Sequence, residues 1–161
     1  MNGRRRGSAL IDAGSVAELL GRWWWNYDEG VFSVLDDLLT EDVHFTCRTD
    51  TGTTDFEEFV RADVRGRDDV MRWQRAHRLD SPYPLRHHGT NIHLVECSDV
   101  TARFASYIHV THHVDGQCVN LSSAIVNGAV AIEAGVLRIS ALEVVLDTMS
   151  STLFREVREL R

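Results

Sequence analysis

The second half of the chain is a series of long strand-like segments joined by turns of only a few residues. Stretches rich in β-branched and aromatic residues alternate with the separators "CSD", "VDGQ" and "EAG". Such short connections favour antiparallel neighbours, so we expect four consecutive strands to form a meander. The four segments are "TNIHLVE", "VTARFASYIHVTHH", "CVNLSSAIVNGAVAIE" and "VLRISALEVVLD".

The first half of the chain is predicted to be mainly helical. Apolar residues of "SVAELLGRWWWNYDEG" recur at the i, i+3, i+4 and i+7 positions of an amphipathic helix, which Ser15 would cap. We expect a second short helix in "FSVLDDLL", a strand in "VHFTC", and one or two helices over residues 55–78 with a break near Gly66. Helices followed by a long antiparallel sheet predict an α+β fold, with the helices on one face of the sheet.

Length and composition limit the class of protein. The chain is expected to form a single domain over residues 1–161, with residues 1–12 and 150–161 peripheral or flexible. The net charge of −7, from 17 basic and 24 acidic residues, argues against a nucleic-acid partner. No apolar run is long enough to cross a bilayer, so we expect a cytoplasmic protein without membrane contact. The 3 cysteines have no CxxC spacing, which predicts neither a disulfide framework nor a thiolate zinc site.

Asp28 interrupts the apolar pattern of the first predicted helix. It follows Trp24 by four residues and Leu20 by eight, so it lies on the apolar stripe of the helix. A carboxylate there points at the interior or at a cavity, where it could take part in acid–base chemistry. The alternative is an ordinary aspartate that faces water at the end of the helix, just before Gly30.

Two adjacent histidines stand at the start of the first strand of the meander, in "RHHGTN". Because side chains alternate along a strand, His87 and His88 face opposite sides, and a slip of one residue would exchange them. A neutral histidine beside a buried carboxylate is a common proton-transfer pair. The alternative is one hydrogen-bonded core histidine and one solvated histidine. The 8 histidines show no metal-ligand spacing such as HExxH, so we expect neither a metal nor another cofactor.

Several of these motifs resemble known families. "HHGTNIHLVE" and "ELLGRWWWNYDEGVFSVLDDLLTEDVHF" resemble a strand entry and the first two helices of the γ-hexachlorocyclohexane dehydrochlorinases, and "VRGRDDVM" is similar to the start of their third helix. The order Tyr27-Asp28 is similar to that of the scytalone dehydratases. The chain is thereby identified as a member of the SnoaL-like, nuclear transport factor 2-like superfamily. This resemblance implies a cystatin-like cone, in which a curved antiparallel sheet forms a barrel around N-terminal helices with a pocket at the open end.

The resemblance also implies the site and its chemistry. It places Asp28 and His87, in preference to His88, in a catalytic dyad. The implied activity is cofactor-independent proton transfer on a small apolar molecule, by a lyase such as a dehydratase or dehydrohalogenase, or by an isomerase. His87 would remove the proton and Asp28 would orient its ring. The residues predicted to contact the substrate are Tyr27, Trp24, His88, Asn91, Tyr107 and His109.

Two other functions stay open, and the surface suggests a partner. The protein could bind a small molecule without turnover, or serve as a structural subunit like the β-chain of a ring-hydroxylating dioxygenase. The last two strand segments carry apolar residues at both alternating positions, which predicts that both faces of the sheet are covered. We therefore expect a homo-dimer or trimer.

Overall fold

The computed structural model describes residues 11–158, and this part of the chain forms an α+β fold as predicted. The predicted peripheral segments fall partly outside it, at residues 1–10 and 159–161. No helix of the described part is long and apolar enough to span a bilayer. The elements follow one another as α1 (Ala13–Asp28), α2 (Phe32–Asp37), β1 (Leu39–Thr49), α3 (Glu57–Val60), β2 (Ala62–Arg65), α4 (Arg67–Leu79), β3 (Leu85–Cys97), β4 (Thr101–Val114), β5 (Gln117–Glu133), β6 (Val136–Leu146) and α5 (Phe154–Arg158).

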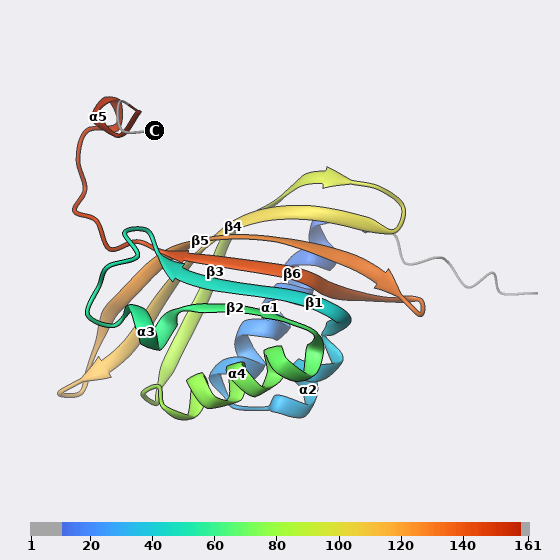
Figure 1. The fold of residues 1–161 in the computed structure, drawn as a ribbon, viewed down its shortest axis with the longest axis horizontal. Helices are drawn as coiled ribbons and strands as arrows, with labels where there is room; N and C mark the ends of the chain where they lie inside the picture. Colours follow the sequence, from blue (N-terminus) through green and yellow to red (C-terminus); the bar gives the residue numbers. More distant parts are fainter. Residues whose placement is uncertain (1–10, 159–161) are drawn as a thin grey trace, which may run out of the picture.

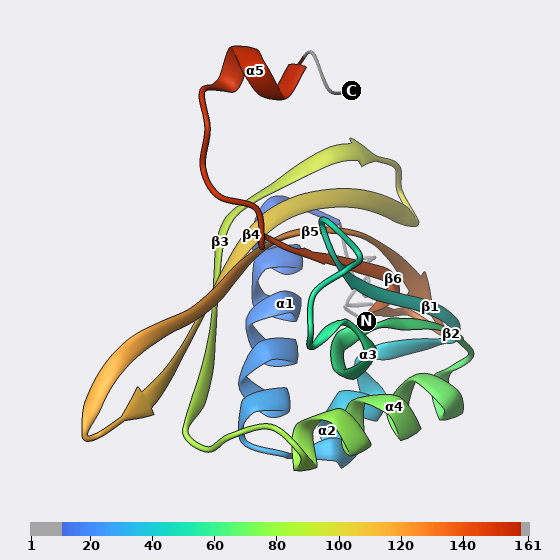
Figure 2. The same cartoon turned by 60° about the vertical axis from the view of Figure 1, so that its left-hand side comes forward.

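The strands form one curved sheet in the order β2-β1-β6-β5-β4-β3. The strands β3 to β6 are antiparallel neighbours, which confirms the predicted meander. Strand β1 runs parallel to β6, a long-range pairing that no local pattern indicated. The curved sheet packs on the N-terminal helices as predicted, but it stays open, with β2 and β3 at its edges, so the cone-shaped barrel does not close. Helices α1, α2 and α4 lie against one face, and α5 stands apart at the end of the chain (Figures 1 and 2).

Helix α1 buries the stripe that the sequence predicted. Its buried residues are Val16, Leu19, Leu20, Trp23, Trp24, Tyr27 and Asp28. The cap is Asp12 and not Ser15: the Asp12 carboxylate accepts a hydrogen bond from the Ser15 backbone at 2.7 Å, and the Ser15 hydroxyl accepts one from the Asp12 backbone at 3.0 Å. This reciprocal capping box starts the helix earlier than expected and leaves Asp28 as its last residue.

The segment over residues 55–78 contains a strand that periodicity did not reveal. Strand β2 has only four residues, too few to show alternation clearly, and it pairs with β1. The predicted break at Gly66 is correct, because this glycine has a φ of +84° and α4 begins at the next residue. Helix α4 then runs beneath the sheet beside α2 (Figure 2).

Gly128 marks a place in the sheet where a side chain would not fit. A Cβ atom here would lie 2.5 Å from Cζ of Phe104 and 2.5 Å from the backbone oxygen of Ala141, which cannot rotate away. We expect Gly128→Ala to lower the free energy of unfolding by about 2–3 kcal/mol in urea denaturation. The control is Gly21→Ala, where nothing lies within 4 Å of the new atom. It should stabilise helix α1 by up to about 1 kcal/mol; similar losses in both variants would contradict the prediction.

Candidate functional site

Asp28 accepts two hydrogen bonds from a single residue of the edge strand β3. Its Oδ1 lies 2.6 Å from Nδ1 of His87, and its Oδ2 accepts the backbone N–H of His87 at 2.8 Å. The Asp28 and His87 side chains are 5% and 12% exposed. The carboxylate comes from the end of the buried stripe of α1, and the N–H it binds belongs to an edge strand. One side chain thus joins the helix, the strand and the imidazole.

This geometry determines which ring nitrogen of His87 can react. A carboxylate can only accept hydrogen bonds, so the proton of the neutral ring is assigned to Nδ1. The lone pair then resides on Nε2, which has no hydrogen-bond partner among residues 11–158. If Nε2 takes a proton, the ring becomes an imidazolium whose charge Asp28 stabilises. This is the geometry that a general base and a carboxylate that orients it would need.

Aromatic side chains of α1 hold the His87 ring in place. Trp24 stacks on it with ring centroids 4.9 Å apart and planes 9° apart, and Tyr27 meets it edge-on at 5.3 Å. Trp24 also lies over Gly89 of the same strand, where an added Cβ would be at the contact distance of 3.4 Å from the indole. Of the predicted substrate-contacting residues, Trp24 and Tyr27 are the two that border His87.

The register of β3 decides between the two adjacent histidines. His87 pairs with the buried Val110 of β4, and His88 pairs with His109. His88 lies on the opposite face, where its Nε2 is 3.1 Å from Oγ1 of Thr111 and its ring is 5.8 Å from that of His109. The residue beside Asp28 is therefore His87.

The structure does not bring the other predicted substrate-contacting residues to this pair. Tyr107 is 54% exposed and alternates with buried neighbours on β4, so it lies with His88 and His109 on the outer face of the sheet. His109 is bound there to Oδ1 of Asn120 at 2.8 Å. Asn91 is exposed at an irregularity of β3, with a φ of +56°. Side-chain alternation or a local bulge turns each of these four residues away from the Asp28–His87 pair.

Sequence reasoning missed a second polar pair, formed by Tyr27 and His77. The Tyr27 hydroxyl lies 2.6 Å from Nδ1 of His77, which α4 contributes. The His77 ring is sandwiched between Phe59 at 4.4 Å and Trp73 at 4.6 Å. Trp73 precedes His77 by four residues, and this helical spacing of an aromatic and a histidine was a signal that could have been used.

Burial keeps both members of this second pair uncharged. It lowers the pKa of His77 to about 4, with smaller contributions from the charges of His87 and Arg78. Burial also raises the pKa of Tyr27 well above its usual value. Nε2 of His77 is buried and has no hydrogen-bond partner in the described part of the chain. The interior near His87 therefore holds a neutral imidazole and a neutral phenol that share one hydrogen bond.

Arg78 fixes the end of helix α1 that carries the aspartate. Its guanidinium donates to the backbone oxygens of Tyr27 and Asp28, the shortest bond being 2.7 Å to Asp28. It also donates to the backbone oxygens of Ser81 at 3.4 Å and Pro82 at 3.1 Å, in the segment that leads to β3. The residue is only 6% exposed. A single buried cation thus links the C-terminal end of α1, where the helix dipole is negative, to the segment that precedes β3.

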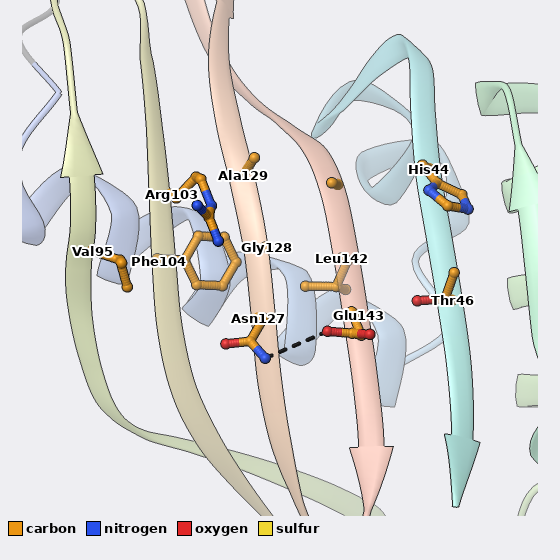
Figure 3. A pocket seen from close by; sticks show the side chains of 11 residues that line it. His44, Thr46, Val95, Arg103, Phe104, Asn127, Gly128, Ala129, Leu142 and Glu143 are labelled. Atoms are coloured by element: carbon orange, nitrogen blue, oxygen red, sulfur yellow. Dashed lines mark hydrogen bonds between the residues drawn. The ribbon is translucent and has the colours of Figure 1, made fainter. Parts of the chain in front are cut away.

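Two hollows of the protein surface lie away from the Asp28–His87 pair, and Figure 3 shows one of them. Both are on the sheet, and neither is lined by Asp28 or His87, so neither of them is the conical pocket expected around the dyad. Residues 11–158 contain no group of three or more His, Cys, Asp or Glu side chains placed to share a metal ion.

The fold and the site together define the class of protein. A curved open sheet with helices packed on one face is the fold of a cystatin-like α+β domain. In this chain a buried His–Asp pair lies between the first helix and an edge strand. The chain belongs to the SnoaL-like family, because the model of the SnoaL-like domain matches residues 8–143. No curated protein matches the sequence.

Solved structures show the same fold at low sequence identity. A cystatin-like protein of unknown function from Nostoc punctiforme is 16% identical, with a TM-score of 0.70 over 89% of this chain and 98% of the other. A protein proposed to be a scytalone dehydratase, from Novosphingobium aromaticivorans, is 14% identical with a TM-score of 0.63 over 87% and 86%. The β subunit of a proposed aromatic-ring-hydroxylating dioxygenase from the same organism is 10% identical with a TM-score of 0.68 over 88% and 93%. These likenesses establish the fold, and function rests on the site.

Proposed function

We propose that the protein is a cofactor-independent lyase or isomerase that removes a carbon-bound proton from a small, largely apolar molecule. The observation that carries this proposal is the 2.6 Å contact between Asp28 and Nδ1 of His87, which leaves Nε2 as the basic atom. Nε2 takes the proton, and Asp28 stabilises the imidazolium that forms. Proton transfer by a positioned base of this kind typically accelerates a reaction by about 10²–10⁴-fold.

The second pair supplies a hydrogen-bond donor for such a reaction. If Nδ1–H of His77 donates to the Tyr27 oxygen, the phenolic proton is free to bind a carbonyl or leaving group of the substrate. The Tyr27 ring meets the His87 ring edge-on, and in this proposal the two residues act on one molecule. The indole of Trp24 adds an apolar surface, which suits an apolar substrate. In this proposal His88 and Tyr107, on the outer face, have no part in the chemistry.

A structural role is the second candidate. The likeness to a dioxygenase β subunit and the position of both hollows away from His87 favour it. A binding protein without turnover would keep the Asp28–His87 pair only to hold a ligand. In either case the partner is a small molecule or a protein, and the cytoplasm is the proposed location.

Deuterium exchange tests the proton transfer without knowledge of the natural substrate. A panel of aryl ketones, β-hydroxy ketones and β-halo ketones would be incubated with the protein in D₂O, with exchange at the α-carbon followed by NMR. We expect at least one class to exchange faster than in buffer, and His87→Gln to remove about 100-fold or more of that acceleration. The matched control is His88→Gln, which changes the adjacent histidine on the opposite face and should retain the rate.

The panel also separates the alternatives. Exchange at the buffer rate with every compound would contradict the enzymatic proposal and favour binding or structural roles. Exchange that survives in His87→Gln, or that is lost equally in His88→Gln, would show that the Asp28–His87 pair is not its source.

A further inference from the structure

One nitrogen of the Tyr27–His77 pair has no partner inside the described part of the chain. The buried side-chain atoms of residues 11–158 without a hydrogen-bond partner are Oγ1 of Thr40, Oγ of Ser106 and Nε2 of His77. The two hydroxyls can rotate towards a partner, but the imidazole is fixed, because Phe59 and Trp73 stack on it and Nδ1 is bonded to Tyr27. A buried polar atom without a partner is costly, which indicates that the partner of Nε2 comes from a bound molecule.

The role of Tyr27 determines what Nε2 can bind, so this inference rests on the proposed function. In that proposal the Tyr27 hydroxyl donates to the substrate, and its oxygen accepts the Nδ1 proton of His77. A neutral imidazole carries one N–H, so Nε2 then holds a lone pair and can only accept a hydrogen bond. The ring stays neutral because burial lowers the pKa of His77 to about 4. The missing partner of Nε2 is therefore a donor.

Tyr27 places both imidazoles beside one small molecule. Its ring centroid is 5.3 Å from that of His87 and 6.3 Å from that of His77, and its hydroxyl is bonded to the His77 ring itself. A carbonyl group that accepts the Tyr27 proton therefore lies close to the ring that carries Nε2. A second group of the same molecule can then reach that nitrogen.

The aromatic cover over the His77 ring is able to move on one side. Phe59 stacks on this ring but is 45% exposed, and it belongs to α3, a helix of four residues without a side-chain cap. Its ring can turn towards solvent without a change in the core, which opens the imidazole to a ligand. Trp73, on the other side, packs against the buried Phe45 and stays in place.

The surroundings favour a donor without a charge. The guanidinium carbon of Arg78 lies 6.0 Å from the centre of the Tyr27 ring, and its charge, after burial and the charge of His87, lowers the pKa of His77. It would repel a positively charged amine in the same way, whereas a hydroxyl group donates without a charge. We propose that Nε2 of His77 accepts a hydrogen bond from a hydroxyl group of the substrate, so that the protein selects an uncharged carbonyl compound that also carries a hydroxyl group.

Matched ligands test this contact without any turnover. The probes are acetophenone and its meta- and para-hydroxy and methoxy derivatives, and isothermal titration calorimetry at neutral pH measures their affinities for the full chain. We expect one hydroxy compound to bind about 10-fold or more tightly than both acetophenone and its own methoxy analogue, which cannot donate. His77→Phe keeps an aromatic ring between Phe59 and Trp73, and its affinities for the three compounds should lie within about 2-fold of one another. The control is His88→Phe, the same change on the outer face, which should keep the preference.

A ratio of affinities separates recognition from a merely structural role, because a general loss of folding would weaken all the ligands together. The proposal is overturned if the wild type binds none of the compounds, if it does not prefer a hydroxy compound, or if the preference survives in His77→Phe. It is also overturned if NMR of the imidazole nitrogens finds the His77 proton on Nε2, a result that needs no variant. Deuterium exchange without a hydroxyl preference would retain the proposed reaction and reject this contact. A hydroxyl preference that depends on His77, without exchange, would support the contact and reject the reaction.

Discussion

Arg78→Met should lower the free energy of unfolding by about 3–5 kcal/mol, although the new side chain is of similar length. The guanidinium is buried, and it donates to the backbone oxygens of Tyr27, Asp28, Ser81 and Pro82. Methionine leaves these oxygens without that donor. The bonds to Tyr27 and Asp28 are buried, those to Ser81 and Pro82 are partly buried, and each unsatisfied buried group costs about 1–3 kcal/mol. Urea denaturation at neutral pH measures the loss.

Two further substitutions separate the hydrogen bonds from the charge. Arg72→Met removes an equally long cation that is 76% exposed, and it should change the stability by less than about 0.5 kcal/mol. Arg78→Lys keeps the charge but cannot reach all four oxygens with a planar fork, so it should lie between the wild type and Arg78→Met. A loss in Arg78→Met no larger than in Arg72→Met would show that the end of α1 is held by other contacts.

Acidification should destabilise the protein through His77. Its pKa is 6.5 in an unfolded chain and about 4 in the folded protein, so the unfolded state binds more protons between these values. The stabilisation is complete above pH 6.5 and is lost as the pH falls towards 4. The shift corresponds to about 2 kcal/mol after allowance for the solvent that reaches this half-buried ring.

The measurement is the difference between the wild type and His77→Gln, which can still bond to Tyr27 but does not titrate. We expect the stability advantage of the wild type over His77→Gln to shrink by about 2 kcal/mol between pH 7 and pH 4.5, while carboxylates common to both cancel. His88→Gln, on the outer face, should keep the full pH dependence of the wild type. An advantage that stays constant with pH would show that His77 is protonated as easily in the folded protein as in the unfolded chain.

Local periodicity accounts for the parts of the fold that could be predicted from the sequence. The stripe of α1 and the four strands of the meander each follow from side-chain spacing within one segment. The alternation within β4 also indicates which of its faces is buried, because buried Phe104 and Ile108 alternate with Tyr107 and His109. The prediction that Tyr107 and His109 contact the substrate did not take this alternation into account.

The remaining features depend on contacts between distant segments. The parallel pairing of β1 with β6 joins Phe45 to Leu142, and nothing within either strand specifies the other. His77 and Arg78 reach the site only because α4 packs beside the end of α1. Strand alternation left His87 and His88 as alternatives, and family resemblance was needed to choose between them. Motif similarity therefore identified the pair, while its supporting residues required the three-dimensional structure.

The second hydrogen bond of Asp28, to the backbone of His87, has a consequence for solubility. Strand β3 is an edge of the sheet, and the unpaired N–H groups of an edge can template the strands of other molecules. The Asp28 carboxylate accepts one of these N–H groups, so this group is not available to another strand. The aspartate that binds the His87 ring therefore also satisfies an N–H at the edge of the sheet, and its loss would leave that N–H open to the strand of another molecule.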